Sequence, residues 1–239
     1  LWTFSAVHRF QPDPLYRQMA DRAFDVVMNR FWDPQYGGAF WRLDGDGRVL
    51  DASKKTYGQA FYIYALAEYH LAFGAPSALK RAVELFDLLE RHARDARQGG
   101  YWEVRRRDWS EAADSRLSDK DLNEKKSMNN HLHVLEGFTN LYRAEKDSRV
   151  VQRLREVAAL FEQHILDPHT GHLHHFFDEQ WRVRSDTYTF GHDIEASWLW
   201  CEAAEVLGDD ALLQQARQIA VRMAEVAYQE GLDDDGGLC

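Results

Sequence analysis

The chain has 239 residues, of which 45% are hydrophobic, 13% aromatic and 28% charged, a composition typical of a folded globular protein. Its net charge of -10 argues against a protein that binds nucleic-acid phosphates, and no apolar run reaches the roughly 18 residues of a membrane span. The two cysteines, Cys201 and Cys239, are too few for a disulfide framework or a multi-cysteine zinc site. We therefore expect a cytoplasmic protein that binds neither nucleic acid nor membrane.

Helical segments follow one another along most of the chain. Apolar residues recur three and four positions apart, the spacing that places them on one face of a helix. Pro14 starts one helix, and the glycines in "FGAPS" (73–77) and "LGDD" (207–210) end others. The predicted helices, eight in four hairpins, span 1–10, 14–32, 54–74, 77–96, 127–145, 147–166, 191–207 and 209–230.

Glycine-rich loops separate the predicted hairpins at intervals of about sixty to seventy residues, as in a repeat. The first three continue with alternating aromatic and polar residues, the period of a short strand or β-hairpin. The loops are "YGGAFWRLDGDG" from Tyr36, "QGGYWEVRRRDW" from Gln98, "TGHLHHFFDEQW" from Thr170 and "DGGLC" from Asp235.

The two helices of a hairpin differ in composition. In three hairpins the first helix is rich in aromatic and small residues, as in "YGQAFYIYALAEY", whereas its partner has a charged face, as in "LKRAVELFDLLERHARDA". This alternation predicts an inner ring of buried helices inside an outer ring of half-exposed ones, which is an all-α toroid. An open α-solenoid has similar patterning, but its connections are usually short, so the long loops favour the toroid.

The first turns of the inner helices would surround a central pocket, so polar residues there are candidates for ligand contact. Tyr57 stands in the first turn of "KKTYGQAF", where a core tyrosine with its hydroxyl at the rim is the alternative. In "KSMNNHLHVLEGF", Asn129 and His133 share a helix face, as do His133 and Glu136, while His131 points elsewhere. A buried histidine without a catalytic role remains an alternative for His133. A metal site on the two histidines is disfavoured, because their directions diverge.

The stretch "TFGHDIEASWLW" (189–200) sets polar residues at the start of another apolar helix. His192 and Glu195 are three apart on one face, so the carboxylate is placed to orient the imidazole or to hold its proton, an arrangement that suits a general base. Asp193 lies in the first turn, where the helix dipole alone explains a carboxylate.

Further histidines and tryptophans lie in loops or deeper in helices. The loop histidines, interpreted mainly as loop or rim residues, are His172, His174 and His175. Trp109 and Trp181 lie in loops on the pocket side, where an aromatic face suits the C–H side of a pyranose. Trp198 and Trp200 lie deeper in their helix and are predicted to belong to the core.

Four segments of the chain resemble the cellobiose 2-epimerases, in the N-acylglucosamine 2-epimerase superfamily. They are "LWTFSAVHRF", "KKTYGQAFYIYALAEY", "DLNEKKSMNNHLHVLEGFTNLYR" and "SDTYTFGHDIEASWLWCEAAEVLG". The resemblance implies an (α/α)6 barrel, of which the predicted helices would form about four of six hairpins, with short β-hairpins in the connecting loops. Residues 1–239 would then be a single barrel domain, incomplete at both termini.

The resemblance also implies a reaction. It opens the reducing-end glucose ring of a β-1,4-linked disaccharide such as cellobiose or lactose, removes the C2 proton, and returns a proton to the opposite face of a cis-enediolate, giving mannose. His192 matches one of two catalytic histidines, Glu195 matches its partner, and His133 is a candidate for assisting ring opening. The implied substrate-binding residues are Tyr57, Asn129 and Trp181. No metal or other cofactor is implied; the partner is a small sugar, and the assembly is a monomer or weak homo-oligomer.

The chain also departs from the family pattern. The second catalytic histidine of the family would fall beyond Cys239 and its active-site arginine before Leu1, so we expect the 239-residue piece alone not to epimerise. An aldose–ketose isomerase or a monosaccharide 2-epimerase is an alternative, because the same enediolate is open to reprotonation at C1. A glycoside hydrolase would need two opposed carboxylates. A non-catalytic sugar-binding protein is the remaining alternative.

Overall fold

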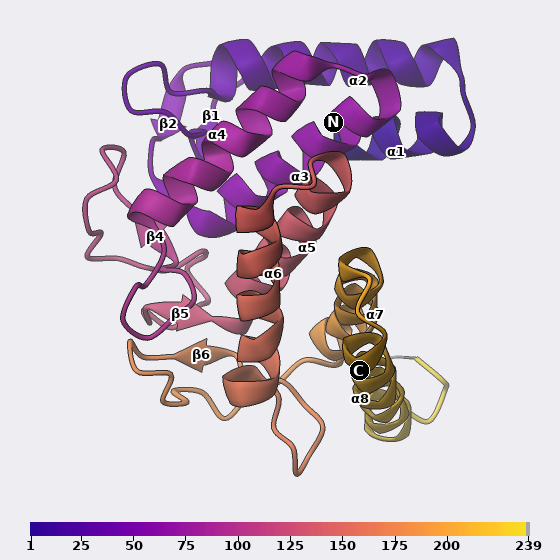
Figure 1. Cartoon of the computed structure of the whole chain (residues 1–239). Coiled ribbons are helices and arrows are strands. Elements are labelled where there is room, and N and C mark those ends of the chain that lie inside the picture. The colour runs from indigo at the N-terminus through magenta and orange to yellow at the C-terminus, as the bar shows by residue number, and fades with distance from the viewer. Residues whose placement is uncertain (238–239) are drawn as a thin grey trace.

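The computed structural model describes residues 1–237, so Cys239 lies outside the described residues. Its helices follow one another as hairpins, coloured from indigo to yellow in Figure 1. They are α1 (Trp2–Phe10), α2 (Pro14–Val26), α3 (Thr56–Phe73), α4 (Pro76–His92), α5 (Met128–Ala144), α6 (Ser148–Leu160), α7 (Phe190–Leu207) and α8 (Asp210–Glu230). Two π-helical turns, η1 (Val27–Phe31) and η2 (Phe161–Ile165), extend α2 and α6. The predicted order of helices is confirmed over these residues.

Short antiparallel sheets lie in the loops. They pair β1 (Arg42–Leu43) with β2 (Val49–Asp51), β3 (Lys54–Lys55) with β4 (Val104–Arg105), and β5 (Lys126–Ser127) with β6 (Phe176–Phe177). The first pair is a local hairpin, as predicted. In the next two loops, single bridges from Arg105 to Glu111 and from Phe177 to Val183 form the local hairpin, while β4 and β6 pair with the segments that precede α3 and α5. These two loops are therefore each tied to the preceding inner helix.

The first helices of the hairpins form an inner row in which α1 packs on α3, α3 on α5, and α5 on α7. Thirteen of the 17 residues of α5 are buried, which is the burial expected of an inner helix. The backbones of α3 and α5 approach closely, since a Cβ added at Gly137 would lie 2.7 Å from the carbonyl oxygen of Ala60. Because the strand-bearing loops connect at the starts of α3, α5 and α7, these starts lie at one end of the row (Figure 1).

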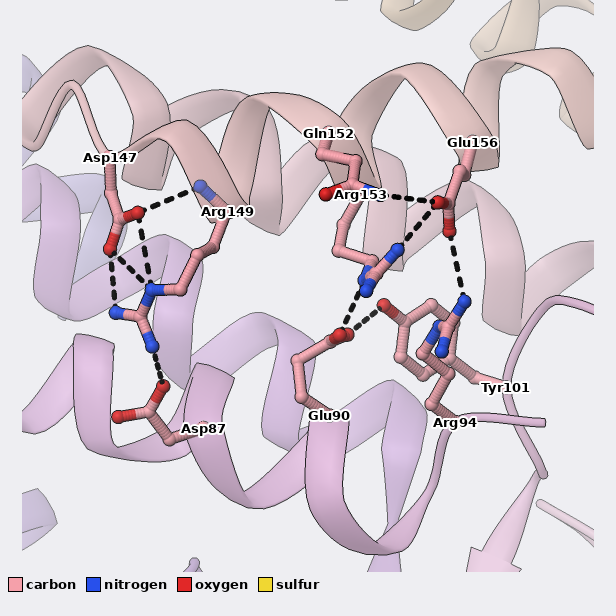
Figure 2. A network of polar contacts seen from close by, with 9 residues as sticks. All are labelled: Asp87, Glu90, Arg94, Tyr101, Asp147, Arg149, Gln152, Arg153 and Glu156. Atoms are coloured by element: carbon pink, nitrogen blue, oxygen red, sulfur yellow. Dashed lines mark hydrogen bonds and ion pairs between the residues drawn. The ribbon is translucent and has the colours of Figure 1, made fainter. Parts of the chain in front are cut away.

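The outer helices α4 and α6 meet through charged side chains, which Figure 2 shows. Arg153 of α6 contacts Glu90 of α4 and Glu156 of its own helix. The hydroxyl of Tyr101 donates to Glu90 over 2.5 Å. The other members of the network are Asp87, Arg94, Asp147, Arg149 and Gln152. Since an exposed ion pair contributes about 0–1 kcal/mol, the pair between Arg149 and Asp87 adds little to the stability of the fold.

Each of the first three glycine loops is held by the fourth residue of the inner helix that follows it. Gln59 accepts from the backbone N–H of Ala39 over 2.8 Å, and His131 accepts from that of Tyr101 over 2.9 Å. Asp193 accepts from the backbone N–H of Leu173 over 3.0 Å. We call Gln59, His131 and Asp193 the latch residues. They fix the rotation of each inner helix, so that residues two positions away in sequence face the opposite side.

A buried lysine precedes two of the inner helices. Lys54 pairs with Asp33 over 3.1 Å and Lys126 with Asp95 over 2.8 Å, and both ammonium groups are fully buried. Each aspartate belongs to the glycine loop that the latch residue holds. At the same position before α7 stands Tyr188, whose ring stacks on His172 at a centroid distance of 3.7 Å. The third loop is therefore fastened by aromatic stacking where the first two use an ion pair.

Candidate active site

Side chains from three inner helices meet on the side opposite the latch residues. The rings of Tyr57 on α3 and His133 on α5 lie edge to face, with centroids 4.9 Å apart. Burial raises the pKa of Tyr57, and the negative charges of Glu195 on α7 and Glu136 on α5 raise it further. The phenol therefore lies within the field of carboxylates from α5 and α7. Of the predicted site residues, Tyr57 and His133 are thus in contact, and Glu195 acts on Tyr57 through its charge.

His133 is held by the carboxylate that the sequence suggested. Its Nδ1 lies 2.9 Å from Glu136, one helical turn further along α5, and the histidine is only 5% exposed. Phe61 of α3 packs against the imidazole at a centroid distance of 4.6 Å. A bond from Nδ1 to a carboxylate fixes the ring orientation and leaves Nε2 for another partner. The side chain is therefore rigid, and one nitrogen remains for a ligand.

His192 lies half-buried at the start of α7. Burial lowers its pKa, the negative charge of Glu195 opposes that shift, and the neighbouring His133 adds to it. The hydrogen bond on Nδ1 goes to the hydroxyl of Thr189, 2.6 Å away. Glu195 was expected to orient the imidazole through the helix spacing; in the structure Thr189 makes that contact and Glu195 acts on His192 through charge.

Asp193 has a different role from the one expected of it. The helix dipole alone does not explain this carboxylate, because it is 1% exposed and accepts from the N–H of Leu173 as a latch residue. Its other oxygen lies 2.8 Å from Nδ1 of His172. Burial raises the pKa of Asp193, against the opposing contact with His172. Asp193 therefore fastens the third loop and faces away from His192.

A cleft of about 270 Å³ lies beside His192. Asn129, one turn before His133 on α5, lines it as the sequence predicted for a ligand contact. The cleft is also lined by His175 and Glu103, which are not among the site residues predicted from the sequence. Burial lowers the pKa of His175 to about 4 and raises that of Glu103 to about 8. Both groups are therefore uncharged near neutral pH, so the wall of the cleft is polar without carrying their charges.

Trp181 does not offer a face to a sugar, which corrects its predicted role in substrate binding. It is 5% exposed, and its indole N–H donates to the carbonyl of Gln98 over 2.9 Å. His164 stacks on its ring at 5.0 Å and the ammonium of Lys126 lies 4.7 Å from its centroid. Trp109 is similarly buried, with His92 stacked on it at 5.4 Å. Both tryptophans are therefore packing residues of their loops.

Trp198 was predicted to be core but is 49% exposed, whereas Trp200 is buried at 2% as predicted. Trp198 follows Glu195 by three residues and so lies on the same face of α7. Together with His192 and Glu195 it lines an open depression. The spacing from Glu195 was a signal in the sequence that could have identified Trp198. No such local signal pointed to His175, whose contact with His192 joins a loop to a helix.

Two further observations hold for residues 1–237. No group of three or more histidine, cysteine, aspartate or glutamate side chains in this range is placed to hold a metal ion. Nor is any helix of this range long and apolar enough to cross a membrane. The candidate site is accordingly described by its imidazoles, its carboxylates, Tyr57 and Asn129.

Known proteins resemble the chain over its whole length. The profile of the N-acylglucosamine 2-epimerase (GlcNAc 2-epimerase) family matches residues 1–239. A cellobiose 2-epimerase of Bacteroides fragilis is 46% identical over 238 residues, which is 100% of this chain and 60% of that protein. The solved structure of a cellobiose 2-epimerase from Bacillus thermoamylovorans superposes with a TM-score of 0.94 at 34% identity, over 99% of this chain and 61% of that one. The chain thus spans about 60% of the length of these relatives.

Both the sequence and the fold of the chain match these relatives. A cellobiose 2-epimerase of Ruminococcus albus is 33% identical over 98% of this chain and 60% of its own length. The hairpins of the structure correspond to about four of the six in an (α/α)6 barrel, with the expected short strands in the loops. Both the profile match over every residue and the superposition lead to one assignment: this chain belongs to the N-acylglucosamine 2-epimerase family.

Proposed function

We propose that the intact protein containing this chain is a sugar 2-epimerase that converts the reducing-end glucose of a β-1,4-linked disaccharide to mannose. The observation that supports this most directly is the ring contact between Tyr57 and His133, with His133 near enough to act on His192 through charge, in a chain 46% identical to a cellobiose 2-epimerase. Imidazoles exchange protons near neutral pH, which removal of a C2 proton requires. The substrate class is therefore a neutral disaccharide such as cellobiose or lactose.

In this proposal each side chain has a defined task. His192 removes or returns the C2 proton through Nε2, because its Nδ1 is bonded to Thr189. His133, oriented by Glu136, assists ring opening at the sugar oxygens. Tyr57 and Asn129 contact those oxygens. The negative charge of Glu195 favours the imidazolium that His192 becomes after proton removal.

The reaction also needs a second acid/base group on the other face of the planar enediolate. The family resemblance assigns that role to a histidine further along the sequence. Trp198 replaces Trp181 as the proposed surface for stacking on a sugar ring, because it is exposed beside Glu195. We further propose that residues 1–239 form part of a single barrel domain in a cytoplasmic monomer or weak homo-oligomer.

Deuterium exchange tests the proposal. The intact protein, incubated with cellobiose in deuterated water, is expected to place deuterium at C2 of both epimers, and His192→Asn is expected to abolish this exchange. His169→Asn is a matched control, because His169 is exposed in the third loop and lies outside the candidate site. Absence of C2 exchange in the unmutated protein would refute any mechanism through the enediolate.

Aldose–ketose isomerisation is a second candidate function. A D-mannose isomerase of Marinomonas mediterranea is 28% identical over 60% of this chain. The same enediolate gives an epimer when it is protonated at C2 and a ketose when it is protonated at C1. Chromatography of the products formed from cellobiose separates these outcomes, because a mannose-ended disaccharide indicates epimerisation and a fructose-ended one indicates isomerisation.

A further inference from the structure

The hydroxyl of Thr189 lies between two imidazoles. Its Oγ1 is 2.6 Å from Nδ1 of His192 and 3.4 Å from Nε2 of His175. The two rings are nearly perpendicular, at 80°, with centroids 5.6 Å apart. A hydroxyl carries one proton, so it donates to one imidazole while accepting from the other. The three side chains therefore form a directed row of hydrogen bonds from the third loop to the candidate catalytic histidine.

Thr189 makes this contact in place of a helix cap. It is the residue before α7, where a threonine hydroxyl usually accepts from a backbone N–H of the first turn and contributes about 1 kcal/mol. Ser127, at the same position before α5, does cap its helix by accepting from the N–H of Asn130 over 3.1 Å. Thr189 makes no such side-chain bond. Its hydroxyl is directed to the imidazole instead, so the contact is a specific feature of α7.

The backbone around the row is anchored on both sides. The carbonyl of Thr189 accepts from the N–H of Asp193, the latch residue that also holds Leu173. The carbonyl of His175 accepts from the N–H of Met128 at the start of α5. Because both ends of the row are fastened to inner helices, the Thr189 hydroxyl keeps its place relative to the two rings.

Chemistry decides the direction of the row. When His192 takes up a proton at Nε2 it becomes an imidazolium, whose Nδ1–H has to donate. If the neutral ring also carries its proton on Nδ1, the Thr189 oxygen accepts in both states and the hydroxyl need not turn over. The hydroxyl proton then points to Nε2 of His175, which is neutral near pH 7 because burial lowers its pKa to about 4. With the opposite direction of the row, the Thr189 hydroxyl would have to turn over in every catalytic cycle. A preorganised hydroxyl avoids that cost.

We propose that Thr189, supported by His175, is a positioning residue that holds neutral His192 as the Nδ1–H tautomer and so leaves its Nε2 as the base. The tautomer itself does not depend on the proposed function, whereas its effect on rate rests on that function. The titratable groups that act on His192 through charge are Glu195 and Asp193 on α7 and His133 on α5, and the ring of His175 in the loop lies beside it. None of the first three bonds to Nδ1, so the assignment rests on the Thr189 contact.

Nitrogen-15 chemical shifts of the histidine rings in the intact protein test the assignment directly. Thr189→Val keeps the side-chain shape without the hydroxyl, and Thr189→Ser keeps the hydroxyl. We expect the Nδ1–H form of His192 in the unmutated protein and in the serine variant. The valine variant is expected to show the Nε2–H form that predominates in a free histidine side chain. Thr187→Val, which removes a threonine hydroxyl that lines the same cleft but makes no hydrogen bond to either ring, is expected to leave the tautomer unchanged.

Rates provide the second measurement. In the intact protein Thr189→Val is expected to lower kcat roughly tenfold with KM unchanged, at the lower end of what loss of an imidazole's hydrogen-bond partner costs. The value is modest because Thr189 is exposed and water competes for the contact. Thr189→Ser should restore the rate. His175→Phe should have a smaller effect, since its contact is the longer one.

Two outcomes overturn the proposal: an unchanged His192 tautomer in a folded Thr189→Val variant, or a serine variant whose tautomer resembles that of valine. A third outcome separates it from the proposed function. If the tautomer follows the substitutions as described but no protein exchanges deuterium at C2, the positioning contact stands and the epimerase proposal fails.

Discussion

His131 and His133 lie two residues apart on α5 and face opposite sides of the helix. His131 is fully buried on the loop side, where its Nε2 accepts from Tyr101 N–H and its Nδ1 lies 2.7 Å from the carbonyl of Ser127. His133 faces the inner space, where it meets Glu136 and Tyr57. Both nitrogens of His131 are occupied by backbone, whereas Nδ1 of His133 is bonded to a side chain. One face of the helix therefore holds the fold, and the other face is available to contact a ligand.

The same division applies to the neighbouring inner helices. On α3 the latch residue Gln59 holds a loop while Tyr57 faces the inner space, and on α7 Asp193 holds a loop while Glu195 faces inward. The polar residues at the start of an inner helix thus form two groups, the latch residues and the inward-facing residues. Substitution of the first group is expected to change stability, and substitution of the second to change activity. Substitutions on each face distinguish them.

The largest expected effect is that of His133→Asn on activity. The asparagine amide is still able to donate to Glu136, so the free energy of unfolding should change by less than about 1 kcal/mol. The rate of C2 exchange in the intact protein should fall at least about 100-fold, because an acid/base side chain is lost. Urea denaturation and deuterium exchange measure the two quantities. Full activity in a folded variant would show that the inward face of α5 takes no part in the chemistry.

Next comes Gly100→Ala, which disturbs the loop side. Gly100 has a φ of +76°, and a Cβ there would lie 2.5 Å from Nε2 of His131 and 2.5 Å from the ring of Trp181. We expect the free energy of unfolding to fall by roughly 3 kcal/mol, from backbone strain and overpacking together. Gly74→Ala is the control, because Gly74 has a φ of +63° with no heavy atom within 4 Å of a Cβ, and should cost only about 1 kcal/mol. Equal losses in urea denaturation would mean that the latch contact is loose.

The pH dependence of stability gives a third test of the loop side. Burial lowers the pKa of His131 to about 4 from its ordinary 6.5, so the unfolded chain binds a proton between these values that the folded chain does not. The free energy of unfolding therefore falls as the pH is lowered from 6.5 to 4, by up to about 3 kcal/mol from this residue. His131→Gln, which introduces the residue type of the α3 latch, should remove this contribution of His131 to the pH dependence while keeping the hydrogen bond to Tyr101.

The quantity to compare is the difference in the free energy of unfolding between the His131→Gln variant and the unmutated protein at each pH. His175 contributes to the same acid window, and Glu103, with a pKa raised to about 8, makes the fold less stable as the pH rises from 4.5 to 8. Both groups are present in the two proteins, so their contributions cancel in the difference. Parallel stability curves between pH 4 and 6.5 would contradict the buried, neutral state of His131.

The smallest effects are expected for two tryptophans. Trp198→Ala should raise KM for the disaccharide about fivefold, corresponding to the loss of about 1 kcal/mol of binding, without lowering stability. Trp181→Phe should leave KM unchanged and lower the free energy of unfolding by about 1 kcal/mol, because the carbonyl of Gln98 loses its indole donor. Steady-state kinetics and thermal denaturation of both variants test whether Trp198 contributes to binding and Trp181 to stability.

Residues that depend on local periodicity were predictable. The order of the helices, and the facing of Tyr57, His133 and Glu195 toward one space, follow from the helical repeat and from the position of each residue in its first turn. Trp198 was within reach of the same reasoning through its spacing from Glu195.

Contacts between a loop and a distant helix were not predictable. Asp193 holds Leu173 twenty residues earlier, and Trp181 donates to Gln98 from 83 residues further along the chain. Nothing in the composition of either stretch specifies the partner, because an aspartate or a tryptophan has the same local preferences in a pocket as in a packed loop. The role of Thr189 depends likewise on His175, which approaches only when the third loop folds back on α7.

Lys126 shows why these hairpins are not interchangeable modules. Its ammonium contacts Asp95 and the carbonyl of Gly99 in the second glycine loop and the carbonyl of Glu179 in the third. A graft that brought Tyr188, the residue at the same position before α7, in place of Lys126 would leave Asp95 as an unpaired buried charge, which typically costs 3–5 kcal/mol. Neighbouring hairpins are therefore coupled through Lys126, and exchange of hairpins is expected to be tolerated only where both halves of the ion pair are kept.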